Sequence, residues 1–501
     1  MDADVVIAGA GPVGLLLAAE LRLAGVRPLL LDRLPGPTGQ RKARGIGPLA
    51  VEALARRGLA EAVAGYREAA EADLRRDRAG VDGAASKLHF GWIHRVDPVL
   101  PGEPERVGSL IWQRDLERIL AAHAAGLGVV PHWEHTVTGL DTAGDEVVVT
   151  VDTPRGTRRI RAGHVVGCDG GRSAVRALAG FDFPGTDPML IGRIARIEAD
   201  GPPLPTGRLR TERGIFSHDG ERGVVGTFEF DARAADRTPL AATSLQESIR
   251  RVTGVPAVVT AIAEPQQFTD YAAQASTYRR GRVLLAGDAA HVHSPNGGQG
   301  LTLGLLDAAN LGWKLAATVA GTAPGGLLDS YTAERHPVAA SVLANTLAQS
   351  VLMRPGPHVD ALRAVLTDLM ELPDVNRYFA RMLTGLDLRH EFPYPGNGHP
   401  LLGRPCPDLR ITRTGGECRL SELTGSGHAV LLCEENAFPA GIPAIPPDRV
   451  RLVPVRSTSR ADTATLLVRP DGIVAWAARP GEDAGTGPRA ALATWFGTHL
   501  P

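Results

Sequence analysis

The sequence predicts a mixed α/β fold built on a parallel sheet, and three stretches of the chain carry this prediction. Each contains an apolar run, typical of a buried parallel strand, with glycines, an acid and a helical pattern close behind it. The three stretches are 4–32, 164–176 and 281–315.

The first stretch has the order of a dinucleotide-binding βαβ unit. An apolar run leads to Gly9, Gly11 and Gly14 at G-x-G-x-x-G spacing, then to a helical pattern and a second apolar run that ends at Asp32. The first glycine suits a tight turn, the second lets a pyrophosphate approach the backbone, and the third lets the helix pack on the strand. Asp32 stands where a ribose hydroxyl needs an acceptor. The complete unit predicts binding of an adenine dinucleotide; the alternative is a glycine-rich turn without a ligand.

The other two stretches repeat this design. HVVGCDGGRSAVR at 164–176 places Asp169 and two glycines before a helical pattern, and the third stretch places Gly287-Asp288 after its apolar run. A loop then follows that contains Pro295, Gly297, Gly298 and Gly300. Free N–H groups and the dipole of the next helix suit an anionic or strongly polar ligand. The alternative is a structural turn with a capping aspartate.

Two polar residues outside these stretches are candidates for the same site. Arg44 lies in a glycine-bounded loop ahead of a helical pattern, from which it could reach a phosphate or a ring carbonyl. Gln113 lies at a predicted helix start, where its amide could meet a ligand or cap the helix. His89, Trp92 and His94 could line a pocket, but we interpret them as surface or core residues.

The chain is long enough for two or three domains. We predict a cofactor-binding domain over 1–180, with an excursion into the substrate domain near 75–105. Alternating runs over 181–275 indicate an antiparallel sheet, interpreted as an inserted substrate-binding domain. The cofactor-binding domain would resume with long helices over 276–390, and a separate domain would occupy 395–501 after a Pro- and Gly-rich linker.

Composition argues against several classes of partner. A formal net charge of -1 gives no reason to propose nucleic acid or an anionic membrane, and no apolar run reaches transmembrane length. The cysteines form neither a C-x-x-C pair nor a zinc spacing, and they are Cys168, Cys406, Cys418 and Cys433. We therefore expect a reduced, cytoplasmic protein without a metal.

Local patterns predict three further details. The segment 129–151 contains three strand-like runs, and Asp471-Gly472 marks a hairpin turn between two strands. His291 and His293 form an H-x-H pair that could suggest a metal. No third ligand is evident, so we interpret them as structural or as neighbours of a cofactor.

Taken together, the motifs resemble the class A flavoprotein monooxygenases, the group of the para-hydroxybenzoate and phenol hydroxylases. The motifs are GAGPVG at 9–14 with Asp32-Arg33, Arg44 in ARG, CDGGRSAVR at 168–176 and GDAAHVHSPNGGQG at 287–300. DSYTAERHP at 329–337 and the C-terminal segment are more narrowly similar to the aromatic polyketide hydroxylases, which act on anthracycline and angucycline precursors. Rifamycin-modifying monooxygenases are close relatives of that branch.

The resemblance implies a Rossmann-like FAD domain of the para-hydroxybenzoate hydroxylase type, an inserted antiparallel-sheet substrate domain and a thioredoxin-like C-terminal domain. It implies that FAD is held by Gly9, Gly11, Pro12, Val13, Gly14, Asp32, Arg33, Arg44, Gln113, Asp169, Gly287, Asp288, Pro295, Gly298, Gln299, Gly300, Leu301 and Thr302. No catalytic side chain is assigned. The loop containing Pro295, Gly297 and Gly298 would instead line the flavin ring.

The sequence departs from the family pattern at two places. Thr302 stands where the family usually has an asparagine against the pyrimidine edge of the flavin, and a hydroxyl replaces only part of an amide. The helix after Arg44 reads GPLAVEAL in place of a more polar pattern. These changes bear on the substrate reaction more than on FAD binding.

The resemblance also implies a reaction. NADPH or NADH would reduce FAD and leave, and O2 would then form a flavin C4a-hydroperoxide that hydroxylates a polycyclic aromatic polyketide in antibiotic biosynthesis. The alternatives are Baeyer–Villiger insertion or oxidative rearrangement of a related polyketide, and inactivation of a rifamycin-type antibiotic. A dehydrogenase or oxidase that never transfers oxygen and a non-enzymatic flavin sensor are more distant alternatives. The protein would act as a monomer or homodimer.

Overall fold

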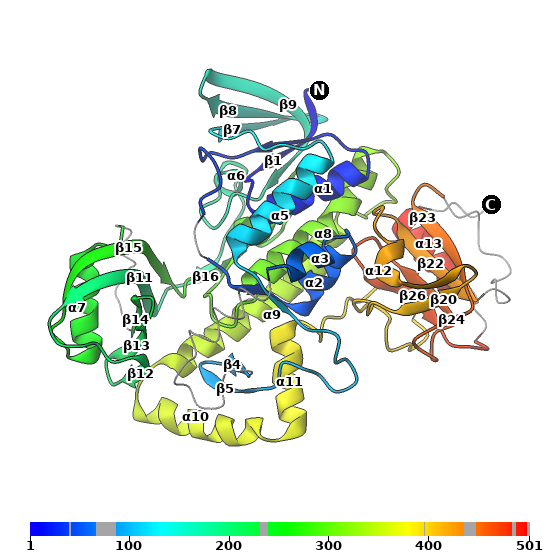
Figure 1. Cartoon of the computed structure of the whole chain (residues 1–501). Coiled ribbons are helices and arrows are strands. Elements are labelled where there is room, and N and C mark those ends of the chain that lie inside the picture. Colours follow the sequence, from blue (N-terminus) through cyan, green and yellow to red (C-terminus); the bar gives the residue numbers. More distant parts are fainter. Residues whose placement is uncertain are drawn as a thin grey trace.

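The computed structural model describes residues 1–39, 42–66, 87–230, 239–394, 396–434, 447–482 and 487–497. Helices and strands are mixed along the whole chain, which confirms the predicted α/β class (Figure 1). The part of the predicted 75–105 excursion before residue 87 lies outside the described residues. Within the described segments, no helix combines the length and apolar character that crossing a bilayer requires.

A parallel sheet stands at the centre of the cofactor-binding part. Its parallel strands are β1 (Ala3–Ala8), β2 (Pro28–Leu31), β9 (Gly156–Gly167) and β18 (Val283–Leu285). Ile7 lies between Leu30 and Val166 in register, and all three side chains are buried. The order is β18-β9-β1-β2, so the three predicted stretches do become neighbouring strands.

Antiparallel strands extend this sheet beyond the parallel core. They are β7 (Thr136–Ala143), β8 (Glu146–Thr153) and β17 (Arg279–Arg280). The prediction of a third strand at the start of 129–151 was wrong. That segment contributes a single bridge between His132 and Leu31, and Pro131 beside it has no N–H with which to continue a ladder.

Helices pack against the parallel sheet, and a hydrophobic core lies between the helices and the sheet. The three main ones are α1 (Pro12–Leu23), α5 (Gln113–Gly126) and α8 (Gly300–Val319). Leu16, Leu116 and Leu311 from these helices are buried in one cluster with the strands. Shorter neighbours are α2 (Pro48–Ala55), α3 (Ala60–Ala64), α6 (Ala174–Leu178), η2 (Gly287–Ala289) and the pair β3 (Gly45–Ile46) with β6 (Ser109–Leu110).

A five-stranded antiparallel sheet lies to one side, at the left of Figure 1. Its order is β12 (Gly207–Thr211), β13 (Gly214–Asp219), β14 (Val224–Phe230), β11 (Leu190–Asp200) and β15 (Val258–Thr269). Phe216 faces helix α7 (Ala242–Thr253), whereas its neighbour Ile215 faces the opposite side. The alternation follows from the two-residue period of a strand. The predicted domain boundaries stay a prediction.

Long helices and small strands connect these sheets. The helices are α9 (Ser330–Met353), α10 (Pro357–Met370) and α11 (Pro373–Thr384). The strands are the hairpin β4 (Leu88–Phe90) and β5 (Ile93–Val96), and a three-stranded sheet of β10 (Gly185–Thr186), β16 (Ala272–Gln274) and β19 (His291–Val292).

The C-terminal part contains two small sheets. The first has the order β23 (Val450–Val455), β22 (Ala429–Glu434), β25 (Thr465–Val468), β26 (Val474–Ala478), with β22 and β23 parallel and the others antiparallel. The second is β21 (Gly416–Arg419), β20 (Arg410–Arg413), β24 (Ser457–Thr458), and two helices, α12 (Leu420–Leu423) and α13 (Gly487–Phe496), flank them. A thioredoxin-like assignment for this part stays a prediction.

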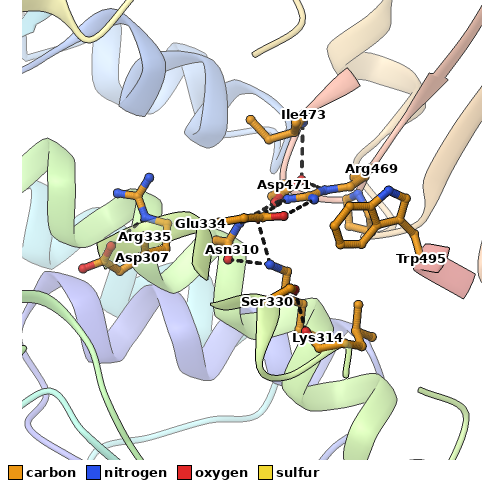
Figure 2. A network of polar contacts seen from close by, with 12 residues as sticks. Asp307, Asn310, Lys314, Ser330, Glu334, Arg335, Arg469, Asp471, Ile473 and Trp495 are labelled. Carbon is orange, nitrogen blue, oxygen red and sulfur yellow. Dashed lines mark hydrogen bonds and ion pairs between the residues drawn. The ribbon is translucent and has the colours of Figure 1, made fainter. Parts of the chain in front are cut away.

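A buried network of charges fastens the C-terminal part to α8 and α9 (Figure 2). Arg469, which precedes the predicted Asp471-Gly472 turn, donates to both carboxylate oxygens of Glu334, at 2.6 and 2.7 Å. Lys314 donates to Glu334 at 2.9 Å, and Asn310 donates to both Glu334 and Asp471. Two cations therefore balance two carboxylates in a site closed to water, where each charge requires a partner.

Replacing Arg469 with methionine should destabilise the protein by about 3–5 kcal/mol, because Glu334 and Asp471 would stay buried without their guanidinium partner. The free energy of unfolding in urea measures this change. The exposed Arg410 provides a matched control as Arg410→Met. Equal effects of the two substitutions would contradict a structural role for the network.

A second prediction concerns His164, which is buried in β9. Burial, with Arg282 and Arg279 nearby, lowers the pKa of His164 from 6.5 to about 4. Between these values the unfolded chain binds a proton that the folded chain does not, so stability falls as the pH falls. This residue alone should cost about 2 kcal/mol between pH 7 and pH 5, and His164→Leu should remove that part of the decline. Unfolding curves at the two pH values test it; an unchanged decline would refute it.

Candidate active site

A cavity of about 2120 Å³ opens at the carboxyl ends of the four parallel strands. A single ligand pocket is roughly 300–1,000 Å³, so this cavity has room for a large cofactor together with a second molecule. All residues predicted to hold the cofactor line it except Gly14 and Gly287. Those that do are Gly9, Gly11, Pro12, Val13, Asp32, Arg33, Arg44, Gln113, Asp169, Asp288, Pro295, Gly298, Gln299, Gly300, Leu301 and Thr302, and Gly297 joins them.

The glycines of the first turn serve two different purposes. A Cβ at Gly14 would lie 1.9 Å from the Gly9 carbonyl oxygen, and one at Gly9 would lie 2.3 Å from the Cys168 carbonyl oxygen. A Cβ at Gly11 would meet no described atom within 4 Å and would point into open space beside the cavity. Gly9 and Gly14 therefore let the chain segments pack, and Gly11 leaves the backbone accessible to a ligand.

Gly287 also has a packing role. It adopts a φ of 63°, which favours glycine, and a Cβ there would lie 2.9 Å from a methyl carbon of Val13. Its N–H donates to Asp307, a fully buried carboxylate that also receives His291 and Arg335, at 2.6 and 2.8 Å. His291 is therefore structural. Asp307 also fixes the turn at Gly287, and the residue after Gly287 is Asp288.

Three carboxylates follow the strand ends, as predicted. The oxygens of Asp32 accept from the N–H groups of Ala10 and Leu34, at 2.7 and 2.9 Å, which fixes the carboxylate beside the glycine turn. Asp169 caps α6 through Oδ2, and its Oδ1 is buried with no hydrogen-bond partner among the described residues. Asp288 is exposed to the cavity. A buried acceptor without a donor fits a site that receives a hydroxyl-bearing ligand.

Two further polar groups line the cavity at the glycine-rich loop. Sequence reasoning missed Asn296, whereas it interpreted His293 as structural or as the neighbour of a cofactor. Asn296 lines the cavity with 9% of its surface exposed, and its Nδ2 has no acceptor in the described segments. His293 donates from Nδ1 to the Ser294 carbonyl at 2.7 Å, and burial lowers the pKa of its ring. The neutral ring therefore keeps Nε2 as an acceptor near Gly300. The sequence did offer one signal for Asn296, because an asparagine in a glycine-rich loop can contact a ligand. The same pattern is equally typical of a turn without a ligand.

The two departures from the family pattern meet in space. The Thr302 hydroxyl accepts from the N–H of Gly47 at 2.7 Å, and Gly47 is the residue that precedes α2, the helix after Arg44. A Cβ at Gly47 would lie 3.4 Å from that hydroxyl oxygen. Thr302 thus joins the Arg44 loop to the start of α8, and its own O–H remains able to donate toward the cavity.

Aromatic side chains line the cavity on the side of the antiparallel sheet. Trp92 and Phe228 meet edge to face with ring centres 5.3 Å apart, and Phe268 continues the row. The Arg208 guanidinium lies 5.0 Å from the Trp92 ring centre. The interpretation of His89 and Trp92 as surface or core residues was therefore wrong, because both line the cavity. The partners of Trp92, Phe228 and Arg208, come from strands more than a hundred residues away, which no local pattern reveals.

Comparisons with known proteins agree with this geometry. The FAD binding domain family matches residues 2–346, and the aromatic-ring hydroxylase C-terminal family matches residues 399–499. The 12-dehydrotetracycline 5-monooxygenase/anhydrotetracycline 6-monooxygenase of Streptomyces rimosus subsp. rimosus is 40% identical over 99% of both chains. Rifampicin monooxygenase of Streptomyces venezuelae is 38% identical over 99% of this chain and 98% of its own.

Solved structures give the same result. The structure of OxyS anhydrotetracycline hydroxylase from Streptomyces rimosus matches with a TM-score of 0.87 and 38% identity, and the match covers 100% of both chains. The chain therefore belongs to the FAD-dependent aromatic-ring hydroxylases of class A, a family of flavoprotein monooxygenases, as its motifs predict.

Proposed function

We propose that this monooxygenase uses NADPH or NADH, together with O2, to hydroxylate a polycyclic aromatic polyketide in antibiotic biosynthesis. The observation that carries the proposal is that one cavity contains both the FAD-side residues and the wall of Trp92, Phe228 and Phe268. Aromatic walls suit flat, fused-ring ligands. The tetracycline-type relative, aligned over almost the whole chain, supports the same substrate class.

The strand-end residues fit FAD. Gly11 would leave room for the pyrophosphate, Asp32 would accept a ribose hydroxyl, and Asp288 would accept from the ribityl chain. The unpartnered Oδ1 of Asp169 supports a further hydroxyl contact. Arg44 and Gln113, which both line the cavity, would reach the pyrophosphate and ribityl region. The flavin ring would lie against the loop over 295–300, where Nδ2 of Asn296 offers a donor.

The side chains of this protein bind and orient rather than react. Reduced flavin, when bound, would supply the electrons that activate O2, and O2 would be the source of the transferred oxygen atom. Trp92 and Phe228 would hold an aromatic ring and exclude water from it. The positive charge of Arg208 near Trp92 would favour an ionised phenol, which is the more reactive form toward an electrophilic oxygen. The single dinucleotide fingerprint in the sequence supports a reductant that binds transiently.

A second candidate is oxidation of a rifamycin-type antibiotic. The rifampicin monooxygenase relative favours it, because its identity to this chain is close to that of the tetracycline-type relative. Both candidates need the same cofactor and the same reductant. They differ only in the molecule that fills the aromatic end of the cavity.

The direct test is to incubate the FAD-loaded protein and NADPH with anhydrotetracycline, with rifampicin, or with neither. We expect anhydrotetracycline to accelerate NADPH consumption and to yield a product heavier by one oxygen atom, because it is a fused-ring phenol. Rifampicin turnover alone would select the second candidate. Peroxide formation at the same rate in all three reactions, with no oxygenated product, would contradict both.

Two glycine substitutions separate cofactor binding from folding. Gly11→Val should preserve the fold and reduce FAD occupancy about tenfold or more, because the side chain would enter the space proposed for the pyrophosphate. Gly14→Val should instead yield little folded protein, because its Cβ would overlap the Gly9 carbonyl. Flavin absorbance per folded molecule and circular dichroism measure the two effects. Full FAD occupancy in Gly11→Val would refute the assigned position of the pyrophosphate.

A further inference from the structure

A chain of three buried amide side chains connects the loop over 295–300 to the aromatic wall. Gln299 lies at the end of that loop, and Asn345 and Gln349 lie one turn apart on α9. Asn345 Nδ2 donates to Gln299 Oε1, and Gln349 Nε2 donates to Asn345 Oδ1 at 3.1 Å. Gln349 Oε1 then accepts from the N–H of Gly91 at 3.1 Å. We refer to Gln299, Asn345 and Gln349 as the amide chain.

Backbone groups fix the direction of the amide chain at both ends. The N–H of Gly91 can only donate, so Gln349 must present its oxygen there and its NH2 group to Asn345. At the other end, Gln299 Nε2 donates to the Met382 carbonyl at 2.9 Å, and that carbonyl can only accept. No amide can rotate without leaving a buried group unpaired. The three side chains therefore behave as one unit.

Gln349 contacts both the loop over 295–300 and the turn at Gly91. A Cβ at Gly297 would lie 2.8 Å from its Nε2, so the loop packs directly on this amide. On the other side, Gly91 begins a turn in which Trp92 has a φ of 64°, an unusual conformation for a bulky residue. Such a conformation persists only where neighbouring groups enforce it. The hydrogen bond from Gly91 to Gln349 is one of these, and Trp92 is part of the aromatic wall.

We propose that Asn345 and Gln349 are positioning residues that hold the Trp92 turn at a fixed place relative to the loop over 295–300. The inference rests on the proposed function in assigning the flavin ring to that loop and the substrate to the aromatic wall. The amide chain then sets the separation between the substrate ring and the site of oxygen transfer. Small displacements of a reacting group cost large factors in rate, so this separation governs how much reductant is used productively.

The test compares Asn345→Leu and Gln349→Leu with the native protein. Gln246→Leu is a matched control, because Gln246 also accepts from a backbone N–H, that of Val259 at 2.9 Å, but lies on α7. The first measurement is hydrogen exchange of the FAD-loaded protein. Asn345 has no hydrogen bond to the Gly91 turn, yet Asn345→Leu should speed exchange about tenfold in 88–96 as well as in 295–300, because local opening becomes easier when the buried chain is broken. The control should speed exchange only near Val259.

The second measurement is the amount of oxygenated product formed per NADPH consumed with anhydrotetracycline. Both amide-chain variants should keep their FAD and their NADPH consumption, while product per NADPH falls about tenfold and peroxide rises. A purely structural role would instead lower FAD content and all activity together.

The outcomes separate this inference from the function on which it rests. Exchange changes confined to α9, or unchanged product per NADPH in a variant that turns over, would overturn the role of the amide chain. A native protein that is loaded with FAD but never oxygenates anhydrotetracycline or rifampicin would overturn the proposed function. The exchange measurement would still show whether the amide chain joins the turn to the loop.

Discussion

The architecture depends on the pairing of Asp307, a carboxylate with no exposed surface. Burial acts to raise the pKa of Asp307, but His291 and Arg335 outweigh it and hold that pKa below its ordinary value. An ionised carboxylate in the interior must keep its donors, so α8, α9 and the turn at Gly287 cannot separate. The residue before Arg335 is Glu334, which binds Arg469 of the C-terminal part (Figure 2). Glu334 and Arg335 are consecutive residues of α9. They therefore connect the C-terminal sheets and the turn at Gly287 to the same helix.

The features that the sequence predicted correctly are those encoded locally. The turn at Gly9, the strand end at Asp169 and the turn at Gly287 each occupy a few consecutive residues whose order of strand, glycine and acid specifies a strand end followed by a turn. Asp471 shows the limit of this reasoning. Its place in a hairpin turn is local and was predicted, but its burial against Asn310 depends on a residue 161 positions away. The ionic partners, the aromatic wall and the amide chain all required the tertiary structure.

The contact between Thr302 and Gly47 changes how two sequence departures are understood. Considered separately and compared with the family pattern, position 302 lacks an amide and the helix after Arg44 lacks polar groups. Together they form one hydrogen bond between the two segments on either side of the proposed flavin position. A Cβ at position 47 would lie at an ordinary van der Waals distance from the hydroxyl, so the bond depends on Thr302 and not on the side chain at position 47. Replacing Thr302 with a residue that lacks an acceptor would therefore leave the Gly47 N–H without this partner.

The C-terminal part contains one hydrophobic cluster of its own and shares a second cluster with the preceding helices. Trp313 from α8 and Leu327 belong to the same buried cluster as Trp495 and Phe496 from α13. The boundary between the two family matches along the sequence is thus not a boundary in the packing. In evolutionary terms, a C-terminal segment cannot be exchanged between distant relatives as a cassette unless α8 and α9 are inherited with it.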